Sequence, residues 1–439
     1  MKPSNYNFLF PYEEDKGKGV IYNARTNALA LLDEDKLESF KTFCLNENDL
    51  SEEFASDLKK AGFILDSEVN EKSLLQYSML RSRYNTERLH LTIAPTHDCN
   101  FGCIYCYEKD VITDLNMSKA VQDRLIEYVK QKAKYISNLS IVWYGGEPLL
   151  TLDTIEYLTK EFKALCAEND ISYSASMITN GYLLTPKVAR LLKSLDVSAI
   201  QITLDGISDV HNKRRPLFDG SETFETIVNN IKDVADILPN NIVLRINIDK
   251  DNTDSLHEIE DFLVQNKLLK IVQPYLGNVE NANECYNDSS CLLPSEFSKI
   301  NFDFNKRIWK HDSSGMMMAY PIQRTNYCSA DSLNSLIISA DGSIYKCYQD
   351  IGNENRKTGS IMDASVHNQD VYQSYMLYDA TLDPGCSECK YLPVCMGNCP
   401  FARLKEGSPQ CAEIKYSLDA YMSIMPQIIR NRKQKAKAG

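Results

Sequence analysis

The sequence has no long apolar segment and no surplus of basic residues. No run of about 18 apolar residues occurs, which excludes a membrane-spanning helix. The first residues, 1–6, lack the apolar stretch of a signal peptide, so we expect a cytoplasmic protein. The net charge of −12 argues against nucleic-acid binding, because phosphate recognition needs a basic face. We therefore expect neither a nucleic acid nor a membrane among the partners.

Cysteine, by contrast, is abundant, with 14 residues in the 439-residue chain. In a cytoplasmic protein this number favours metal ligation over disulfides, because the compartment keeps thiols reduced. Ten of the 14 cysteines fall into two spaced groups, one near residue 100 and one between residues 328 and 411. The composition therefore predicts a metalloprotein.

The first group, Cys99, Cys103 and Cys106, lies in one short loop directly after a predicted strand. Three thiolates at the spacing C-x3-C-x2-C can bind one face of a metal centre and leave a metal position without a protein ligand. A small molecule can bind and react at such an open position. A three-thiol zinc site, with His97 or Asp98 as the fourth ligand, is the alternative.

Six predicted strands alternate with predicted helices across the middle of the chain. The strands are 89–94, 139–144, 172–178, 199–204, 242–248 and 269–275, and the helices are 118–136, 152–168, 186–195, 222–238 and 255–266. Strands alternating with helices imply a parallel sheet with right-handed crossovers. Curled on itself, this sheet becomes a six-stranded open barrel with its ligand at the carboxyl ends of the strands.

Glycine and polar residues stand where several of these strands end. They are Gly145, Gly146, Glu147 and Pro148 after the second strand, Thr179 and Asn180 after the third, and Thr203 and Asp205 after the fourth. Paired glycines let the backbone approach a ligand closely. A hydroxyl and a carboxylate suit ribose hydroxyls, and Arg245 and Asn247 on the fifth strand are placed to point into the barrel.

The cysteine loop, with Tyr105 before its last cysteine, and the G-G-E-P sequence resemble the radical S-adenosylmethionine (SAM) family. The resemblance implies a 4Fe–4S cluster on Cys99, Cys103 and Cys106 whose fourth iron chelates SAM, so these cysteines are catalytic. It implies that G-G-E-P holds the SAM amino group. It assigns SAM contacts to Tyr105, Gly145, Gly146, Glu147, Pro148, Thr179, Asn180, Thr203, Asp205 and Arg215.

The second group of cysteines begins with C-x13-G-x4-C, whose Asp341-Gly342 pair predicts a hairpin turn. The spacing C-x2-C-x5-C-x3-C and one further cysteine follow, and the pattern resembles the SPASM domain of radical SAM enzymes. The resemblance implies two auxiliary 4Fe–4S clusters. Their ligands are Cys328, Cys347 and Cys399 for the first and Cys386, Cys389, Cys395 and Cys411 for the second. An eighth ligand comes from Cys291 or Cys285, or one iron stays open. A zinc knuckle is the alternative.

Residues 1–85 read as a small α+β unit with strands at 6–12, 19–22 and 63–65 and helices at 33–44 and 51–61. The layout resembles the winged-helix-like peptide-recognition domain of maturases that act on ribosomally made peptides. A leader peptide would add a strand to its sheet edge. A structural cap on the main domain is the alternative.

The whole resemblance implies an α/β architecture in three parts: a winged-helix-like leader-recognition domain over 1–85, a radical SAM partial (β/α)6 barrel over 86–310, and a cysteine-rich Fe–S (SPASM) domain over 311–439. It implies three 4Fe–4S clusters, SAM, and flavodoxin or ferredoxin as the electron donor. The implied reaction is an intramolecular cross-link in a precursor peptide, of the carbon–carbon, lysine–tryptophan type made by streptide-type cyclases.

Three other functions stay open. Thioether-forming maturases share the three-part layout. Sulfatase-maturing oxidases carry an aspartate base directly after the G-x4-C cysteine, where this chain has Tyr348, and Asp350 is the candidate base here. The non-enzymatic alternative is a scaffold that binds zinc or a cluster.

Overall fold

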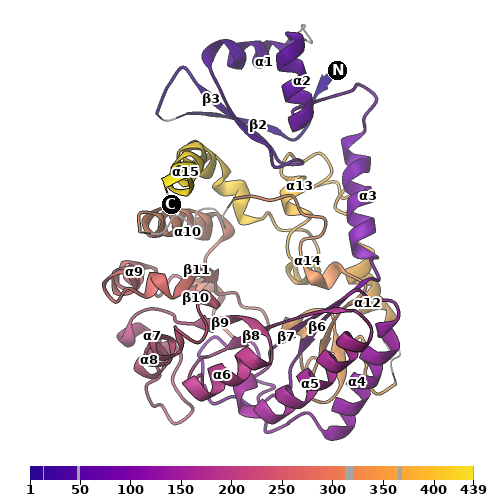
Figure 1. The fold of residues 1–439 in the computed structure, drawn as a ribbon, viewed down its shortest axis with the longest axis vertical. Coiled ribbons are helices and arrows are strands. Elements are labelled where there is room, and N and C mark those ends of the chain that lie inside the picture. The colour runs from indigo at the N-terminus through magenta and orange to yellow at the C-terminus, as the bar shows by residue number, and fades with distance from the viewer. Residues whose placement is uncertain (13, 47–49, 312–319, 364–367, 439) are drawn as a thin grey trace. The chain divides into compact units, whose positions relative to one another are not determined.

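The computed structural model describes residues 1–12, 14–46, 50–311, 320–363 and 368–438, of which 431–438 are described as backbone only (Figure 1). The chain divides into two compact units built from separate stretches of sequence. The first unit contains Met1–Arg83, Leu293–Cys328 and Tyr378–Gly439, and the second contains Tyr84–Leu292 and Ser329–Leu377. These units do not coincide with the three expected domains, so the three-part division stays a prediction.

A mostly parallel sheet forms the centre of the second unit. Its six successive parallel strands are β6 (Arg88–Ile93), β7 (Asn138–Trp143), β8 (Ser172–Thr179), β9 (Val197–Thr203), β10 (Ile242–Ile248) and β11 (Val272–Asn278). The helices between them are α4 (Lys119–Ala133), α5 (Leu152–Glu168), α6 (Pro186–Ser194), α7 (Ser208–Arg214), α8 (Phe224–Val234) and α9 (Leu256–Gln265). All six predicted strands are confirmed, while the sequence analysis missed α7.

Three further strands extend this sheet beyond β6. β12 (Ser335–Ile338) pairs with β6 in parallel, and β13 (Ser343–Tyr345) and β14 (Gly359–Ser360) continue it in antiparallel pairs. The predicted hairpin turn is confirmed, because Gly342 joins β12 to β13 at φ +85°. The hairpin therefore completes the α/β sheet of the second unit. Within the described residues β11 pairs only with β10, so the closure expected of a barrel stays a prediction.

Alternating burial explains why these strands and helices form. Along β7, Leu139, Ile141 and Trp143 are fully buried and alternate with more accessible residues. Helix α4 buries a stripe at helical spacing, and the Oγ atom of Ser118 caps it by accepting from Val121 N at 3.4 Å. Figure 1 shows α4, α5 and α6 ranged along the strands, as such apolar stripes require.

The N-terminal part of the first unit contains a three-stranded antiparallel sheet. Its elements are β2 (Asn7–Pro11), β3 (Gly19–Asn23), β4 (Leu29–Leu32), the pair β1 (Lys2–Pro3) and β5 (Ile64–Leu65), and the helices α1 (Glu34–Asn46), α2 (Glu52–Ala61) and α3 (Glu71–Arg83). β4 was not predicted. Gly62 ends α2 in the left-handed conformation, and the Ser51 side chain makes no capping hydrogen bond. Cys44 is exposed.

The same unit contains helices from the end of the chain. They are α10 (Pro294–Trp309), α13 (Leu392–Cys395), α14 (Pro400–Glu406) and α15 (Leu418–Ala438), while α12 (Gln369–Met376) belongs to the second unit. Tyr22 and Leu75 from the N-terminal part share one apolar core with Met422, Met425 and Ile428 of α15. The two ends of the chain therefore stabilise each other.

Short 3₁₀ turns complete the description: η1 (Pro148–Thr151), η2 (Thr253–Ser255), η3 (Leu268–Lys270), η4 (Asp288–Ser290), η5 (Ser329–Asp331), η6 (Tyr348–Asp350) and η7 (Glu413–Tyr416). Among the described residues, no helix combines the length and the apolar character needed to cross a membrane.

Candidate iron–sulfur and SAM site

The three cysteines of the first group lie together in the loop after β6. Cys99, Cys103 and Cys106 are partly buried, and burial raises the pKa of each thiol. The charges of Cys103 and Cys106 raise the pKa of Cys99 further, so the three sulfur atoms share one electrostatic environment. Thiolates crowded in this way need a cation, which the irons of a cluster provide. The donor set therefore fits a 4Fe–4S cluster with one iron left for another ligand.

The zinc alternative required a fourth side chain beside these thiols. The part of the chain that the structure describes contains no group of three or more His, Cys, Asp and Glu side chains around a single-ion position. His97 Nε2 lies 2.6 Å from Ser339 Oγ, and the backbone carbonyl of Asp98 accepts from Glu147 N at 2.8 Å. The His97 ring thus has another partner, whereas the contact of Asp98 involves only its backbone carbonyl.

Gly145 and Gly146 hold the loop after β7 against the chain leading into the cysteines. A Cβ atom on Gly145 would lie 2.6 Å from Thr96 O, and one on Gly146 would lie 2.1 Å from Asp98 O. Any side chain at either position would push the two loops apart. The close approach inferred from these glycines is therefore made to the cysteine-bearing segment itself.

Glu147 joins the ends of β7 and β8. Its buried carboxylate accepts from Thr179 Oγ1 at 2.7 Å, from Asn180 N at 2.8 Å and from Leu149 N at 2.9 Å. Burial raises the pKa of Glu147, and these three hydrogen bonds oppose that shift. The side chain of Asn180 then donates to Asn100 Oδ1 at 2.8 Å, inside the cysteine loop. These residues fix the loops around the cluster site, and their expected contacts with SAM stay predictions.

Tyr105 is the centre of a hydrogen-bond network at the ends of β9 and β10. Its hydroxyl donates to Asp205 Oδ1 and accepts from Arg215 Nη1 and Asn247 Nδ2, each at 2.9 Å. Burial raises the pKa of Tyr105, so the phenol stays protonated. Thr203, the last residue of β9, is buried beside Arg245 in the strand register. Asp205, expected to bind ribose, is already engaged by Tyr105.

Arg215 keeps one donor available in this network. Its Nε atom is buried and has no hydrogen-bond partner among the described residues, and its guanidinium carbon lies 5.6 Å from the centre of the Phe101 ring. A buried, unpaired donor beside the cysteine loop fits an anionic group of a bound ligand. This observation agrees with the expected role of Arg215 toward SAM.

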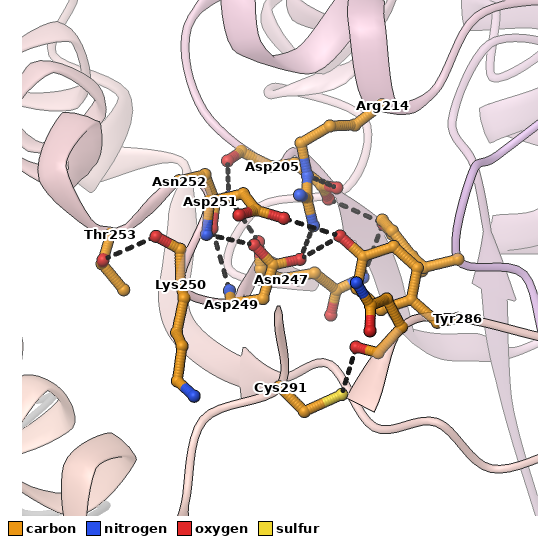
Figure 2. Close-up of polar contacts among 12 residues, drawn as sticks. Asp205, Arg214, Asn247, Asp249, Lys250, Asp251, Asn252, Thr253, Tyr286 and Cys291 are labelled. Carbon is orange, nitrogen blue, oxygen red and sulfur yellow. Dashed lines mark hydrogen bonds and ion pairs between the residues drawn. The ribbon is translucent and has the colours of Figure 1, made fainter. Parts of the chain in front are cut away.

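A buried ion-pair cluster, which the sequence analysis missed, supports the same loops (Figure 2). Arg214 donates from Nε to Asp205 Oδ2 at 2.9 Å and from Nη2 to Asp249 Oδ2 at 2.8 Å. The side chains of both aspartates are fully buried, and Tyr286 donates its hydroxyl to Asp249 Oδ2 at 2.9 Å. An aspartate directly after a strand was the available signal for Asp249. The cluster joins the ends of β9 and β10 to the segment after β11.

The cysteines proposed for the first auxiliary cluster are divided between the two units. Cys347 belongs to the second unit, and Cys328 and Cys399 belong to the first. Cys285, a candidate eighth ligand, is buried, and its Sγ atom lies 3.7 Å from the backbone carbonyl oxygen of Tyr105. The other candidate is Cys291, whose Sγ atom lies 3.6 Å from the backbone carbonyl oxygen of Asn287. The ligand set of this cluster stays a prediction, with the eighth position open.

Four cysteines of the second group line one cavity in the first unit. The cavity holds about 320 Å³, and its walls include Cys386, Cys389, Cys395 and Cys411. Lys415 donates from Nζ to Cys411 Sγ at 3.2 Å. Four thiols around one hollow are the donor set that a 4Fe–4S cluster requires. The residues therefore fit the second auxiliary cluster as the sequence predicted it.

Asp350, the candidate base, is almost fully buried at 1% exposure. Tyr375 donates its hydroxyl to Asp350 Oδ2 at 2.7 Å, and Arg356 donates from Nε to Oδ1 at 3.2 Å. Burial raises the pKa of Asp350, and Arg356 opposes this shift. Both carboxylate oxygens are engaged, so service as a base would require these contacts to break. The base role stays a prediction.

Residues 93–263 match the family described as the radical SAM superfamily. The chain carries a radical SAM domain. The match runs from the end of β6 into α9 and contains the three cysteines of the first group and the G-G-E-P loop. The resemblance inferred from the motifs is thereby confirmed for residues 93–263, which form a radical SAM domain.

Similarity to known proteins extends beyond the radical SAM domain. The radical SAM cyclopropyl synthase TigE of Paramaledivibacter caminithermalis is 24% identical over 421 residues, covering 90% of this chain and 86% of TigE. Native anSMEcpe with bound AdoMet and the Cp18Cys peptide matches with a TM-score of 0.60 at 18% identity, over 79% of this chain and 99% of that one. Streptococcus suis SuiB bound to the precursor peptide SuiA matches with a TM-score of 0.55 at 17% identity, over 94% and 98%. These two structures share the fold.

Proposed function

We propose that this radical SAM enzyme installs an intramolecular cross-link in a ribosomally made precursor peptide, of the carbon–carbon, lysine–tryptophan type. The observation that carries the enzymatic part is the three-thiol loop, held by Gly145 and Gly146 inside the matched domain. The peptide part is supported by the fold shared with SuiB, whose structure contains a precursor peptide, and with anSMEcpe, whose structure contains a peptide and AdoMet.

Cys99, Cys103 and Cys106 would hold the SAM-binding cluster. When bound and reduced, the cluster and SAM supply a 5′-deoxyadenosyl radical that abstracts hydrogen from an unactivated carbon. The protein's part is to bind, orient and exclude water. Arg215 would hold the SAM carboxylate, because its buried Nε lacks a partner among the described residues. Tyr105 keeps the Arg215 guanidinium in place through their hydrogen bond of 2.9 Å.

An external flavodoxin or ferredoxin would supply the electron that reduces the SAM-binding cluster, and the auxiliary-cluster cysteines would hold the group that accepts an electron from the substrate. The four-cysteine cavity supports the second auxiliary site, since Cys386, Cys389, Cys395 and Cys411 line it together. The leader peptide would bind by strand addition to the sheet β2–β3–β4, whose outer strands are β2 and β4.

Thioether formation and sulfatase-type oxidation are the competing reactions. Tyr348 stands where the oxidases have an aspartate base, and Asp350 is paired with Arg356 and Tyr375. Neither position therefore offers an accessible aspartate base, which counts against sulfatase-type oxidation but does not separate a carbon–carbon cross-link from a thioether.

Incubation of the enzyme with the short peptide encoded beside it, SAM and dithionite tests the proposal. Cross-linking removes two hydrogen atoms, so we expect a product about 2 Da lighter, with 5′-deoxyadenosine formed alongside it. Cys99→Ala should abolish both products, whereas Cys166→Ala, in the apolar core of α5, should keep them. An unchanged peptide mass during continued SAM cleavage would reject this peptide as substrate. Zinc in place of iron in Cys99-intact protein would reject the radical enzyme in favour of a scaffold.

A further inference from the structure

Arg245 is a charged residue on the face of the parallel sheet that carries the proposed reaction site. Its neighbours Leu244 and Ile246 are fully buried, whereas Arg245 is only partly buried and therefore lies on the opposite face of β10. Asn247, two residues further along the same face, donates to the Tyr105 hydroxyl. Arg245 thus lies one hydrogen-bonded residue away from the cysteine loop.

The Arg245 guanidinium contacts neutral groups. Its Nε donates to Asn247 Oδ1 at 2.6 Å, and its Nη1 donates to the Tyr275 hydroxyl at 3.4 Å. Among the described residues it forms no ion pair, and the groups that act on it electrostatically are phenols. A guanidinium enclosed by neutral groups and without a counter-ion is costly even when it is only partly buried, so this site is suited to an anion supplied by a ligand.

Gly277 makes room for this guanidinium. A Cβ atom on Gly277 would lie 2.5 Å from Arg245 Nε and 2.6 Å from the guanidinium carbon. Gly277 pairs with Asn247, two residues beyond the Arg245–Tyr275 pair, so the guanidinium reaches toward the carboxyl ends of the strands. Because Gly277 has no side chain, the Arg245 guanidinium lies against the backbone of β11. It is directed toward the end of the sheet where the cysteine loop lies.

The partners of the two adjacent arginines, Arg214 and Arg215, indicate which kind of ligand Arg245 binds. Arg214 is neutralised by Asp205 and Asp249. Arg215 lies against the cysteine loop and has a buried donor to offer. SAM carries one carboxylate, and Arg215 is placed to bind it. A second guanidinium on the same face, which has no ion pair among the described residues, is therefore suited to a second carboxylate.

We propose that Arg245 binds a carboxylate of the substrate, the side chain of an Asp or Glu close to the residue that reacts. The proposal rests on the proposed function for its substrate, a peptide. The planar guanidinium pairs with carboxylates through two parallel hydrogen bonds, so it would set the register of the peptide at the reaction site as well as select its charge.

Two synthetic peptides, Ac-Ala-Gly-Glu-Gly-Ala-NH₂ and its Gln counterpart, test the proposal on the reconstituted enzyme with SAM present. By saturation-transfer NMR we expect the Glu peptide to bind about tenfold more tightly than the Gln peptide, since a charge-assisted pair is made only with Glu. Arg245→Gln should abolish this preference and Arg245→Lys should keep part of it. Arg190→Gln, which removes an exposed arginine of α6, should leave it unchanged.

Equal binding of the two peptides to the wild-type enzyme would overturn the proposal. So would weaker SAM binding in Arg245→Gln, measured by equilibrium dialysis, because the carboxylate held by Arg245 would then belong to SAM. The proposed function is tested separately by modification of the encoded precursor peptide. If that peptide is not modified while the preference for Glu persists, the precursor function fails and the carboxylate site stands.

Discussion

At the scale of single residues, the polar groups beside the cysteine loop divide into supports and candidate ligand contacts. Arg214 is a support, because it bridges two buried aspartates. Among the described residues, Arg215 has a buried donor without a partner, and Arg245 has no ion pair. Buried ion pairs add little net stability when intact but are costly to break, since the remaining charge has no partner. This asymmetry makes Arg214 and the ligand-facing arginines distinguishable by experiment.

Arg214→Met should lower the free energy of unfolding by about 3–5 kcal/mol, because Asp205 and Asp249 would stay buried without their cation. Thermal unfolding of the reconstituted enzyme under anaerobic conditions measures the change. Lys60→Met is the control, since Lys60 and Asp57 form a pair at 3.9 Å with side chains 76% and 69% exposed. An equal loss of stability in the two variants would contradict the supporting role.

His211 should make stability depend on pH. Burial and the nearby cations Arg214 and Arg215 lower its pKa well below 6.5, and its Nδ1 accepts from Asp205 N at 3.2 Å. As pH falls through 6.5, His211 binds a proton in the unfolded chain but stays neutral in the folded chain. The free energy of unfolding should therefore fall with pH, by up to about 1.4 kcal/mol per unit from this group.

Urea unfolding of wild type and His211→Gln at pH 7.5 and pH 5.5 measures this dependence. The variant should lose less stability between the two pH values, because it has no group to protonate there. Identical losses in both proteins would show that His211 does not contribute.

At the scale of elements, the G-G-E-P loop shows how a motif for ligand binding also serves packing. Gly145 and Gly146 allow the turn after β7 to pack closely against residues 96–98. Glu147 connects the same turn to the end of β8 through its hydrogen bond with Thr179. The loops after β6, β7 and β8 are therefore packed against and hydrogen-bonded to one another, and these contacts position the cysteine loop.

Gly146→Ala should reduce SAM cleavage about hundredfold, since displacement of reacting groups by about 1 Å has effects of that size. The added Cβ would lie 2.1 Å from Asp98 O, so the cysteine-bearing segment must shift. Formation of 5′-deoxyadenosine with dithionite measures the loss. Gly17→Ala is the matched control, because the nearest atom to its new Cβ would lie 3.5 Å away. Full activity in Gly146→Ala would contradict the close packing.

At the scale of the whole molecule, stretches distant in sequence share each compact unit. The N-terminal residues 1–83 and the C-terminal residues 378–439 belong to one unit, with Leu75 of α3 in the same apolar core as Met422 and Met425 of α15. The expected leader-binding domain is therefore not stabilised by its own residues alone. A destabilising substitution in α3 should therefore also lower the stability of α15.

Leu75→Ala should cost about 2–5 kcal/mol, as expected for a buried leucine replaced by alanine. Hydrogen exchange of the α15 amides between residues 418 and 430 should accelerate, because the cavity lies in their shared core. Leu74→Ala is the control, since Leu74 is 45% exposed and Leu75 is 1% exposed. Unchanged exchange in α15 would show that the two ends of the chain are stabilised independently.

Local features of the sequence predicted a large part of this structure. The strands and helices of the β/α alternation and the turn at Gly342 involve neighbouring residues, so contiguous sequence was enough to recognise them. The prediction failed where partners are far apart. β12 was assigned to a separate domain because nothing in its sequence indicates that it pairs with β6.

The sequence by itself determined the chemistry available to this protein: three cysteines at C-x3-C-x2-C, the G-G-E-P turn, and the spaced cysteines between residues 386 and 411. These signals are spacings within short stretches, and the thiols follow from residue type alone. Only the tertiary structure decided that Arg214 is neutralised while Arg245, opposite Tyr275 and against Gly277, keeps its charge unpaired among the described residues. Whether a charge is paired depends on which strand ends meet, and that is settled by packing across the sheet.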